Sequence, residues 1–296
     1  MENVIQNCYD KELLRSEIQK LCLMDDMLMK KAFDGCNECS QVLLQVILNN
    51  ATLMVEKTKT QHLFNSIDGH SVILDIYAVD TDGKHYDVEI QKAKKGSSVK
   101  RARYYSAMLD SNILPKGSDY EKLGETYIIF ITEQDVWGEN KPLYNIERCL
   151  VPEGKQINDG AHIIYVNASI KNETPLGKLM SDMFCNSPEN MHYKELADRV
   201  EFFKSKEGGI DLMCELSEKL IRFGKEQGIK EGIKEGIKEG IKEGIKEGIK
   251  EGEASGARKK SIQIAKALLL KKNSIEDVAE VTGLTYAEVE KLAQEL

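Results

Sequence analysis

The sequence predicts an α/β fold in which helices flank a mixed β-sheet and a helical C-terminal extension follows. Apolar runs of strand length occupy residues 72–79, 126–132 and 162–166, and residues 84–91 alternate polar with apolar side chains; both patterns are typical of strands. Ser98 is suited to cap an amphipathic helix over residues 99–109, between two of these runs. Strands separated by a helix indicate an α/β sheet, here of mixed direction. Residues 174–223 have a helical pattern.

The composition is that of a soluble globular protein, with 41% hydrophobic and 30% charged residues in a chain of 296. No apolar run approaches the roughly 20 residues of a membrane span, so we expect no membrane partner. The amino terminus lacks the basic and then apolar segments of a secretory signal, which predicts a cytoplasmic location. Seven cysteines are an odd number, and reduced thiols are expected.

Cys36 and Cys39 form a lone Cys-x-x-Cys motif. A motif of this kind can bind a metal or act as a redox pair, but no second pair and no His cluster accompanies it. We therefore favour thiols on a helix surface over a metal or redox site.

The segment before the sheet is predicted to be helical. Residues 10–34 are expected to form one helix, because several Leu and Ile residues lie on or near one stripe. Asp26 lies near the end of this helix, four residues before Lys30, so the simplest interpretation is an ion pair on the helix surface. A second helix is predicted over residues 40–50, and residues 51–66 lead into the sheet.

Residues 72–91 predict a hairpin of two strands. The sequence Thr81-Asp82-Gly83 has turn chemistry, and a three-residue loop with Gly83 in the left-handed conformation would pair Asp80 with Lys84. This loop fixes the register of the two strands, because each further residue along one strand then has one partner on the other.

In that register Asp75 faces Glu89, and Gln91 projects from the same face of the sheet. Directly opposed residues lie roughly 4.5–5.5 Å apart at Cβ, close enough for two carboxylates to share a divalent cation. An acid inside so apolar a strand costs free energy unless it is paired or bound to metal. The alternative is two incidental acids on a half-exposed hairpin.

The net charge of −8 is not that of a typical nucleic-acid-binding protein. The distribution is more informative, because residues 92–109 carry six basic side chains and no acid. A helix bearing Lys and Arg beside the hairpin could contact a phosphate backbone, while Tyr105 and Leu109 pack inward.

The spacing Asp-x13-Glu-x-Gln on a hairpin, together with three further motifs, resembles the recombination-promoting nuclease (Rpn) transposase family of the PD-(D/E)XK nuclease superfamily. The resemblance covers about residues 20–225. Gln91 stands where the superfamily usually has Lys, and Met29 stands where the family usually has Phe. The further motifs are Asp26-x-x-Met29-Lys30-x-x-Phe33, Arg101-Ala-Arg-Tyr-Tyr105 and Tyr127-Ile-Ile-Phe-Ile-Thr132.

The resemblance implies a PD-(D/E)XK restriction-endonuclease-like core and a Mg²⁺-dependent DNA endonuclease that hydrolyses phosphodiester bonds in transposition or recombination. Asp75 and Glu89 would be the metal ligands, with Gln91 and Asp26 completing the catalytic set. A neutral amide at position 91 cannot supply the charge of the usual Lys. The residues expected to contact DNA are Lys94, Lys95, Lys100, Arg101, Arg103 and Tyr104.

Two other functions remain open at this point. The first is a catalytically degenerate DNA-binding protein that keeps the same fold without turnover. The second is an assembly protein that works through its C-terminal repeat.

From Gly228 to Glu251 the tetrapeptide Gly-Ile-Lys-Glu occurs six times without error. Each Glu precedes the next Lys by three residues, a spacing that favours helix, whereas each Gly costs about 1 kcal/mol relative to Ala in a helix. A period of 4.0 turns the Ile row by about 40° per repeat, and partner helices following it would form a right-handed supercoil. The repeat is either a linker or marginal helix, or an oligomerisation helix.

The tail contains an amphipathic segment at 261–271 and two capped helices that begin after Ser274 and Thr285. The arrangement resembles a helix-turn-helix, but residues 285–296 carry more acidic than basic side chains and would repel phosphate. We favour a protein-contact module, and a homo-oligomer through the C-terminal helices is one expectation. The predicted domains are a nuclease-like domain (1–190), a helical extension (191–223), the repeat (224–256) and this module (257–296).

Overall fold

The computed structural model describes residues 11–66, 69–92 and 96–296. A six-stranded sheet has the order β1-β2-β3-β4-β8-β5. Strands β1, β2 and β3 are antiparallel, β3, β4 and β8 are parallel, and β5 is antiparallel to β8, so the predicted mixed sheet is confirmed. The strands are β1 (Val55–Phe64), β2 (Val72–Asp80), β3 (His85–Gln91), β4 (Thr126–Thr132), β5 (Leu143–Ile146) and β8 (Ala161–Asn167), with a separate ribbon of β6 (Cys149–Leu150) and β7 (Lys155–Gln156).

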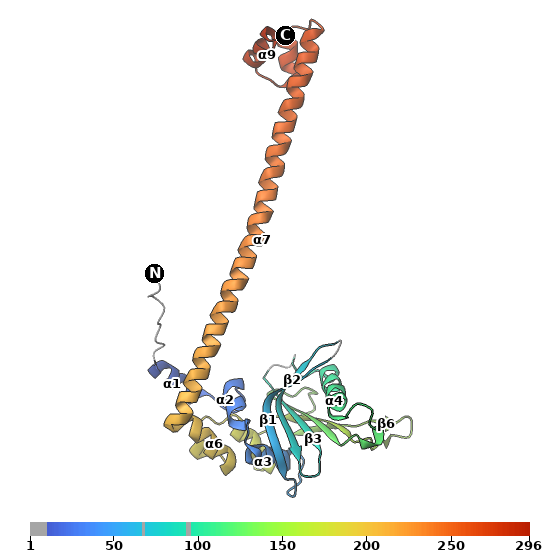
Figure 1. Cartoon of the computed structure of the whole chain (residues 1–296), viewed down its shortest axis with the longest axis vertical. Coiled ribbons are helices and arrows are strands. Elements are labelled where there is room, and N and C mark those ends of the chain that lie inside the picture. Colours follow the sequence, from blue (N-terminus) through green and yellow to red (C-terminus); the bar gives the residue numbers. More distant parts are fainter. Residues whose placement is uncertain (1–10, 67–68, 93–95) are drawn as a thin grey trace. The chain divides into compact units, whose positions relative to one another are not determined.

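Helices flank this sheet, and a long helical segment follows it, as predicted (Figure 1). The chain divides into two compact units, Met1–Leu220 and Ile221–Leu296; the finer predicted division into four segments stays a prediction. In the described part of the chain, no helix combines the length and apolar character that crossing a membrane requires. The helices are α1 (Lys11–Lys20), α2 (Asp26–Phe33), α3 (Asn37–Ile47), α4 (Val99–Ile113), α5 (Pro175–Met183), α6 (Lys194–Ser205), α7 (Glu207–Leu270), α8 (Ile275–Thr282) and α9 (Tyr286–Gln294), with single turns η2 (Tyr120–Lys122) and η3 (Pro188–Asn190).

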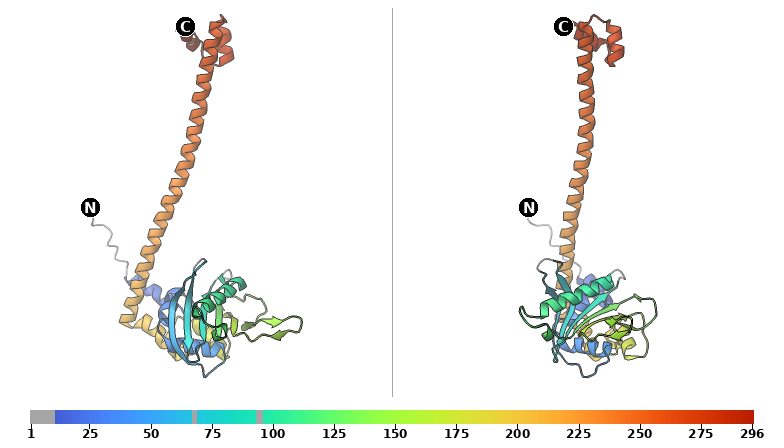
Figure 2. Two further views of the ribbon diagram at one scale, coloured as in Figure 1. Left: turned by 45° about the vertical axis from the view of Figure 1, so that its right-hand side comes forward. Right: turned by 90° about the vertical axis from the view of Figure 1, so that its right-hand side faces the viewer.

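Helix α4 covers one face of the sheet (Figure 2). Its residues Ala102, Tyr105 and Leu109 pack with Phe130 of β4 and Tyr165 of β8. Because side chains alternate along a strand, the same face carries the acids of β3. We call it the α4 face. The predicted helix over 99–109 is confirmed, and the Ser98 side chain caps it by accepting a hydrogen bond from the Arg101 N–H.

The opposite face carries the alternate residues of each strand and is apolar. Val88, Ile129 and Ile164 are buried there. Helix α2 packs at this side of β1, where the Thr60 hydroxyl donates to the Lys30 carbonyl at 3.2 Å. Strand β4 lies between β3 and β8 and is buried on both faces, as its continuous apolar run predicts.

The predicted hairpin register is confirmed. The Asp80 N–H donates to the Lys84 carbonyl at 3.1 Å, closing the loop. Gly83 has φ of 77°, the left-handed conformation that the loop requires. Ile76 then pairs with Val88 on the two strands.

The prediction of one helix over residues 10–34 is wrong. Helix α1 ends at Lys20 and α2 begins at Asp26. Asp25, in an extended conformation, occupies the N-cap position of α2, but its carboxylate accepts a hydrogen bond from the preceding Cys22 N–H at 2.8 Å and none from α2. Asp26 therefore lies in the first turn of a new helix, not near the end of a long one.

Strand β1 was expected only as a segment that leads into the sheet. Its sequence, VEKTKTQHLF, is mostly polar, because an edge strand has one neighbour and exposes much of its surface. The short strands β5, β6 and β7 carry too few residues to show a period. Helix α6 ends at Ser205 and α7 begins at Glu207, so the pair Gly208-Gly209 lies in the first turn of α7 and does not separate the two helices.

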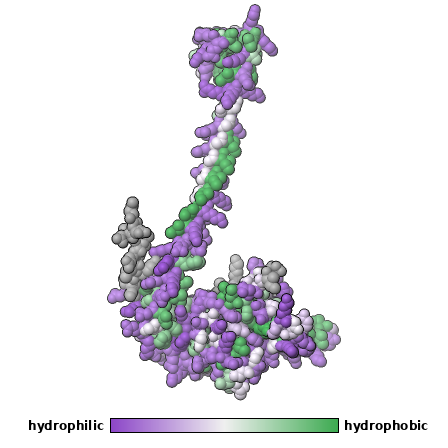
Figure 3. Space-filling model, in the orientation of Figure 1, coloured by the Kyte–Doolittle hydropathy of each residue, from purple (hydrophilic) through white to green (hydrophobic). Residues whose placement is uncertain are grey.

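The unit Ile221–Leu296 is wholly helical apart from its turns. All six repeats lie inside α7, and Figure 3 shows their apolar residues as a band along the helix. At the C-terminus, Ala265, Val278 and Val289 form a small core between α7, α8 and α9. Both predicted caps are present, with Ser274 accepting from the Asp277 N–H and Thr285 forming a full capping box with Glu288.

Candidate active site

Asp75 and Glu89 lie side by side on β2 and β3, and each carboxylate accepts a hydrogen bond from the other strand's backbone. Glu89 Oε1 accepts from the Asp75 N–H at 3.1 Å, and Asp75 Oδ2 accepts from the Ile90 N–H at 3.1 Å. Gln61 adds a longer contact of 3.4 Å to Asp75 Oδ1. The hairpin backbone thus orients both acids, so the pair depends on the register of β2 and β3.

A third acid, Asp87, lies two residues before Glu89 on the same face of β3. Its side chain is fully buried, and no N–H or O–H donor among the described residues reaches either carboxylate oxygen. Burying a carboxylate without donors costs several kcal/mol or more, unless a proton or a cation neutralises it. The sequence analysis assigned Asp87 no role, although the alternation of β3 places it on the face of Glu89.

The three acids share too little positive charge for all to be ionised. Burial and the charge of Asp75 raise the pKa of Glu89 to about 8. Burial also raises the pKa of Asp75. The pKa of Asp87 lies well above its ordinary value because of burial, Glu89 and Asp75, in that order. A cation bound here would favour the ionised forms.

Within residues 11–66, 69–92 and 96–296, no group of three or more His, Cys, Asp or Glu side chains is arranged to hold a metal ion by itself. Asp75 and Glu89 are a two-carboxylate pair. Such a pair fits Mg²⁺, because this ion binds one or two protein carboxylates and keeps several waters. The positive charge of such an ion would also stabilise the donorless oxygens of Asp87 beside the pair.

Arg101 of α4 points into this group of acids. Its Nη2 donates to Glu89 Oε2 at 2.6 Å and to the Tyr105 hydroxyl at 2.8 Å, and its Nη1 donates to the Gly96 carbonyl at 2.9 Å. Its guanidinium lies against a buried carboxylate, because the four-residue step from Arg101 to Tyr105 sets both on the inner side of α4. The expected contact of Arg101 with DNA stays a prediction.

Gln91, the last residue of β3, lies against Gly96. A Cβ at Gly96 would come within 2.0 Å of Gln91 Oε1 and 3.5 Å of Arg101 Nη1. The missing side chain of Gly96 therefore leaves room for the Gln91 amide close to the guanidinium. Gln91 and Arg101 therefore both approach Gly96, at the end of β3.

Asp26 forms the expected ion pair with Lys30, with 2.6 Å between Oδ2 and Nζ. This observation fits the simpler of its two interpretations. The pair also lies within electrostatic reach of Asp75, because Asp26 raises and Lys30 lowers the pKa of Asp75, both less than burial does. A role of Asp26 as an accessory acid stays a prediction.

The other residues expected to contact DNA have different positions. Lys100 and Arg103 are exposed on the outer side of α4. Tyr104 is partly exposed, and its hydroxyl donates to the His70 carbonyl at 2.6 Å. Lys94 and Lys95 lie outside the described residues. For each of these five residues, a contact with DNA stays a prediction.

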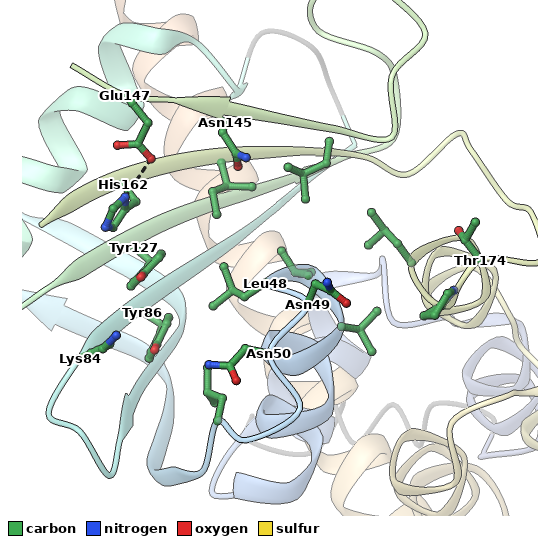
Figure 4. Close-up of a pocket in the computed structure, with 17 residues that line it drawn as sticks. Leu48, Asn49, Asn50, Lys84, Tyr86, Tyr127, Asn145, Glu147, His162 and Thr174 are labelled. Carbon is green, nitrogen blue, oxygen red and sulfur yellow. Dashed lines mark hydrogen bonds and ion pairs between the residues drawn. The ribbon is translucent and has the colours of Figure 1, made fainter. Parts of the chain in front are cut away.

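The opposite face of the sheet has a cleft of about 600 Å³ (Figure 4). Three stacked rings from neighbouring strands line it, Tyr86, Tyr127 and His162, with centroids 5.0 Å and 4.5 Å apart. Each ring has an acidic partner. The Tyr86 and Tyr127 hydroxyls donate to Asp80 and Glu125, and His162 Nδ1 lies 2.9 Å from Glu147.

The Cys-x-x-Cys motif forms the start of α3. Cys36 is the N-cap, and its Sγ accepts a hydrogen bond from the Cys39 N–H at 3.4 Å. The interaction with Cys39 lowers the pKa of the Cys36 thiol to about 7. Cys39 is fully buried, so the expectation of thiols on the helix surface is wrong for that residue.

A mixed sheet with an opposed Asp and Glu on one hairpin, followed by a helix that reaches back to them, defines the PD-(D/E)XK nuclease class. The model of one family, described as PD-(D/E)XK nuclease family transposase, matches residues 26–178, just over half of the chain. The protein therefore belongs to the PD-(D/E)XK nuclease family of transposases, which confirms the predicted family. No curated protein and no solved structure matches the chain.

Proposed function

We propose that the protein is a Mg²⁺-dependent DNA endonuclease that hydrolyses phosphodiester bonds in transposition or recombination. One observation carries the proposal: Asp75 and Glu89 are held side by side by the hairpin backbone, next to the buried and donorless Asp87. Three acids gathered on one face cost stability without a cation. Binding of a hard metal ion would offset this loss of stability.

Asp75 and Glu89 would hold the ion through their carboxylate oxygens. When bound, Mg²⁺ supplies an activated water and neutralises the charge that develops on phosphorus. The Gln91 amide is suited to orient a water or a phosphate oxygen at the end of β3. Arg101 fixes Glu89 and adds a permanent positive charge, which compensates for the missing Lys of the superfamily.

Lys100 and Arg103, which are exposed on α4, would contact the backbone of a DNA molecule that reaches the acids past the partly exposed Asp75. Contacts from Lys and Arg to phosphates position a duplex without reading its sequence. This arrangement supports cutting with little sequence preference, set by the position of the backbone.

The proposal is tested by incubating the purified chain with plasmid DNA and Mg²⁺, with and without chelator, and by titrating Mg²⁺ in a calorimeter. We expect nicking that chelator abolishes, and a Mg²⁺ heat that Asp75→Asn removes. Asp211→Asn, at an exposed position of α7, is the matched control and should change neither result.

Two outcomes would redirect the proposal. A folded chain that binds DNA but neither binds Mg²⁺ nor cuts would be a degenerate member of the family. Cutting by Asp75→Asn at the wild-type rate would place the catalytic site elsewhere.

A further inference from the structure

The repeat helix exposes a continuous apolar row. The six Ile residues from Ile229 to Ile249 occur at every fourth position of α7, and each is 57–63% exposed. Figure 3 shows the row as a band that winds along the helix. Isolated apolar residues are common on protein surfaces, but a row that continues over six turns indicates a contact surface.

The helix cannot owe its stability to local preference. Every fourth residue of the repeat is Gly, the poorest helix former after Pro. Helices in water gain most of their stability by packing an apolar face against a partner. The Ile row is the only apolar face that the repeat offers, since the remaining positions are Gly, Lys and Glu.

The charged residues lie on opposite sides of this row. Successive residues turn by about 100° around the helix axis, so Lys flanks the Ile row on one side and Gly on the other. Because Gly has no side chain, the first side chain beyond it is Glu. The contact surface is thus a seam of Ile and Gly with a basic edge and an acidic edge.

We infer that the repeat helices of two copies of this chain pack in parallel along this seam. In a parallel pair related by a twofold axis, the basic edge of one helix faces the acidic edge of the other. In an antiparallel pair the like edges would meet, with Lys opposite Lys and Glu opposite Glu. Charge complementarity therefore selects a second copy in parallel orientation.

The repeat period also fixes the handedness of the pair. A seam that advances by about 40° every four residues winds around the helix in the right-handed sense. Two helices that keep their seams in contact must form a right-handed supercoil. The Gly positions leave room for the Ile residues of the facing helix, and a second copy supplies them at the same spacing.

This inference is independent of the proposed nuclease function. It follows from the unit Ile221–Leu296 alone, whereas the acids lie in the other unit. Association and cutting are measured separately, so the failure of either leaves the other standing. A parallel pair would attach two sheet units to the same end of the paired helices.

The first experiment measures the oligomeric state of the full chain by sedimentation velocity. We expect a dimer for the wild type and a monomer for Ile237→Lys/Ile241→Lys, which places charge on the seam. The matched control is Ile264→Lys/Leu270→Lys, two exposed apolar positions of α7 after the repeat, and it should stay dimeric. A monomeric wild type, or equal behaviour of both variants, would overturn the inference.

The second experiment tests charge and orientation. A chain with all six repeat Lys replaced by Glu, and one with all six repeat Glu replaced by Lys, should each be monomeric but dimerise when mixed. For orientation, Ile249→Cys should form a disulfide with itself under mild oxidation. If instead only a mixture of Ile229→Cys and Ile249→Cys forms the cross-link, the pair is antiparallel and the inference is wrong.

Discussion

The two faces of the sheet differ in how their charges are balanced. On the α4 face, Asp75, Glu89 and Asp87 share one guanidinium, and Asp87 meets no donor in the described chain. On the opposite face, the cleft of about 600 Å³ is lined by rings whose polar groups each bind an acid. This cleft therefore lies on the face where the acids have hydrogen-bond partners.

Buried charge without balancing partners therefore indicates the candidate active site better than the volume of a cleft does. A large apolar pocket is the usual first candidate for a small-molecule site. A phosphodiester in a duplex is an exposed, extended substrate, so an enzyme that cuts it does not need an enclosed volume. Perturbed pKa values on the α4 face point to the acids.

The largest expected effect comes from comparing two glutamates, each paired with a basic side chain, on the two faces of the sheet. Glu89→Gln should lower plasmid cutting by more than about 100-fold, exceeding what the loss of an outer partner costs. Glu147→Gln, which releases His162 in the cleft, should change it less than about twofold. The measurement is the initial nicking rate at saturating Mg²⁺. Equal losses would mean that the cleft takes part in the reaction.

Arg101 should be the next most sensitive position. Arg101→Met should lower the nicking rate by about 10- to 100-fold, as is typical for a group that orients a metal ligand. Adding Gln91→Lys should then recover part of the loss, because the new ammonium lies where the guanidinium was. Arg222→Met, at an exposed position of α7, is the control. Absence of any recovery would argue against charge compensation between positions 91 and 101.

A smaller effect is expected for the exposed basic residues of α4. Lys100→Ala and Arg103→Ala should each weaken DNA binding similarly for all sequences and lower the slope of log affinity against log salt by about one. Lys84→Ala removes the same charge from the cleft side and should leave the slope unchanged. Fluorescence anisotropy at several salt concentrations measures this. An unchanged slope for the α4 variants would place the DNA elsewhere.

The smallest effect is a pH dependence of stability in chelator. Glu89 has a pKa of about 8 in the folded chain and an ordinary value of 4.5, so the folded state binds the proton more tightly. Stability should therefore fall as the pH rises from about 5 to about 8, by a few degrees in Tm. Glu89→Gln should flatten this curve and Glu147→Gln should not. Added Mg²⁺ should raise the wild-type Tm most at the upper pH, where the acids are ionised.

The hairpin was predictable because its information is local. Turn residues and alternation fix the register of β2 and β3, and the register alone brings Asp75 beside Glu89. Capping residues likewise located α4, α8 and α9 to within a few residues. The residues that determine each of these elements lie within about ten positions of one another in the sequence.

The rest depended on contacts between distant segments. Strand β1 was missed because its sequence is mostly polar. It pairs with β2 alone, at the edge of the sheet, and its formation does not require an apolar run. The ion pair between Arg101 and Glu89 was not predicted, because periodicity places a residue on a helix but does not show which acid it contacts. The room that Gly96 leaves for Gln91 depends on the close approach of two chain segments, which spacing in sequence does not reveal.

The perfect tetrapeptide repeat has a consequence for how the protein can evolve. If whole repeat units were gained or lost, each unit would change the helix length by about 6 Å and turn the segment beyond it by about 40°. Because every unit carries the same seam, a longer or shorter helix still matches another of its own length. Alleles of different length would leave unpaired ends when mixed. The number of repeat units therefore sets the length of the helix before the tail, and this length can change in whole units without any change of residue type.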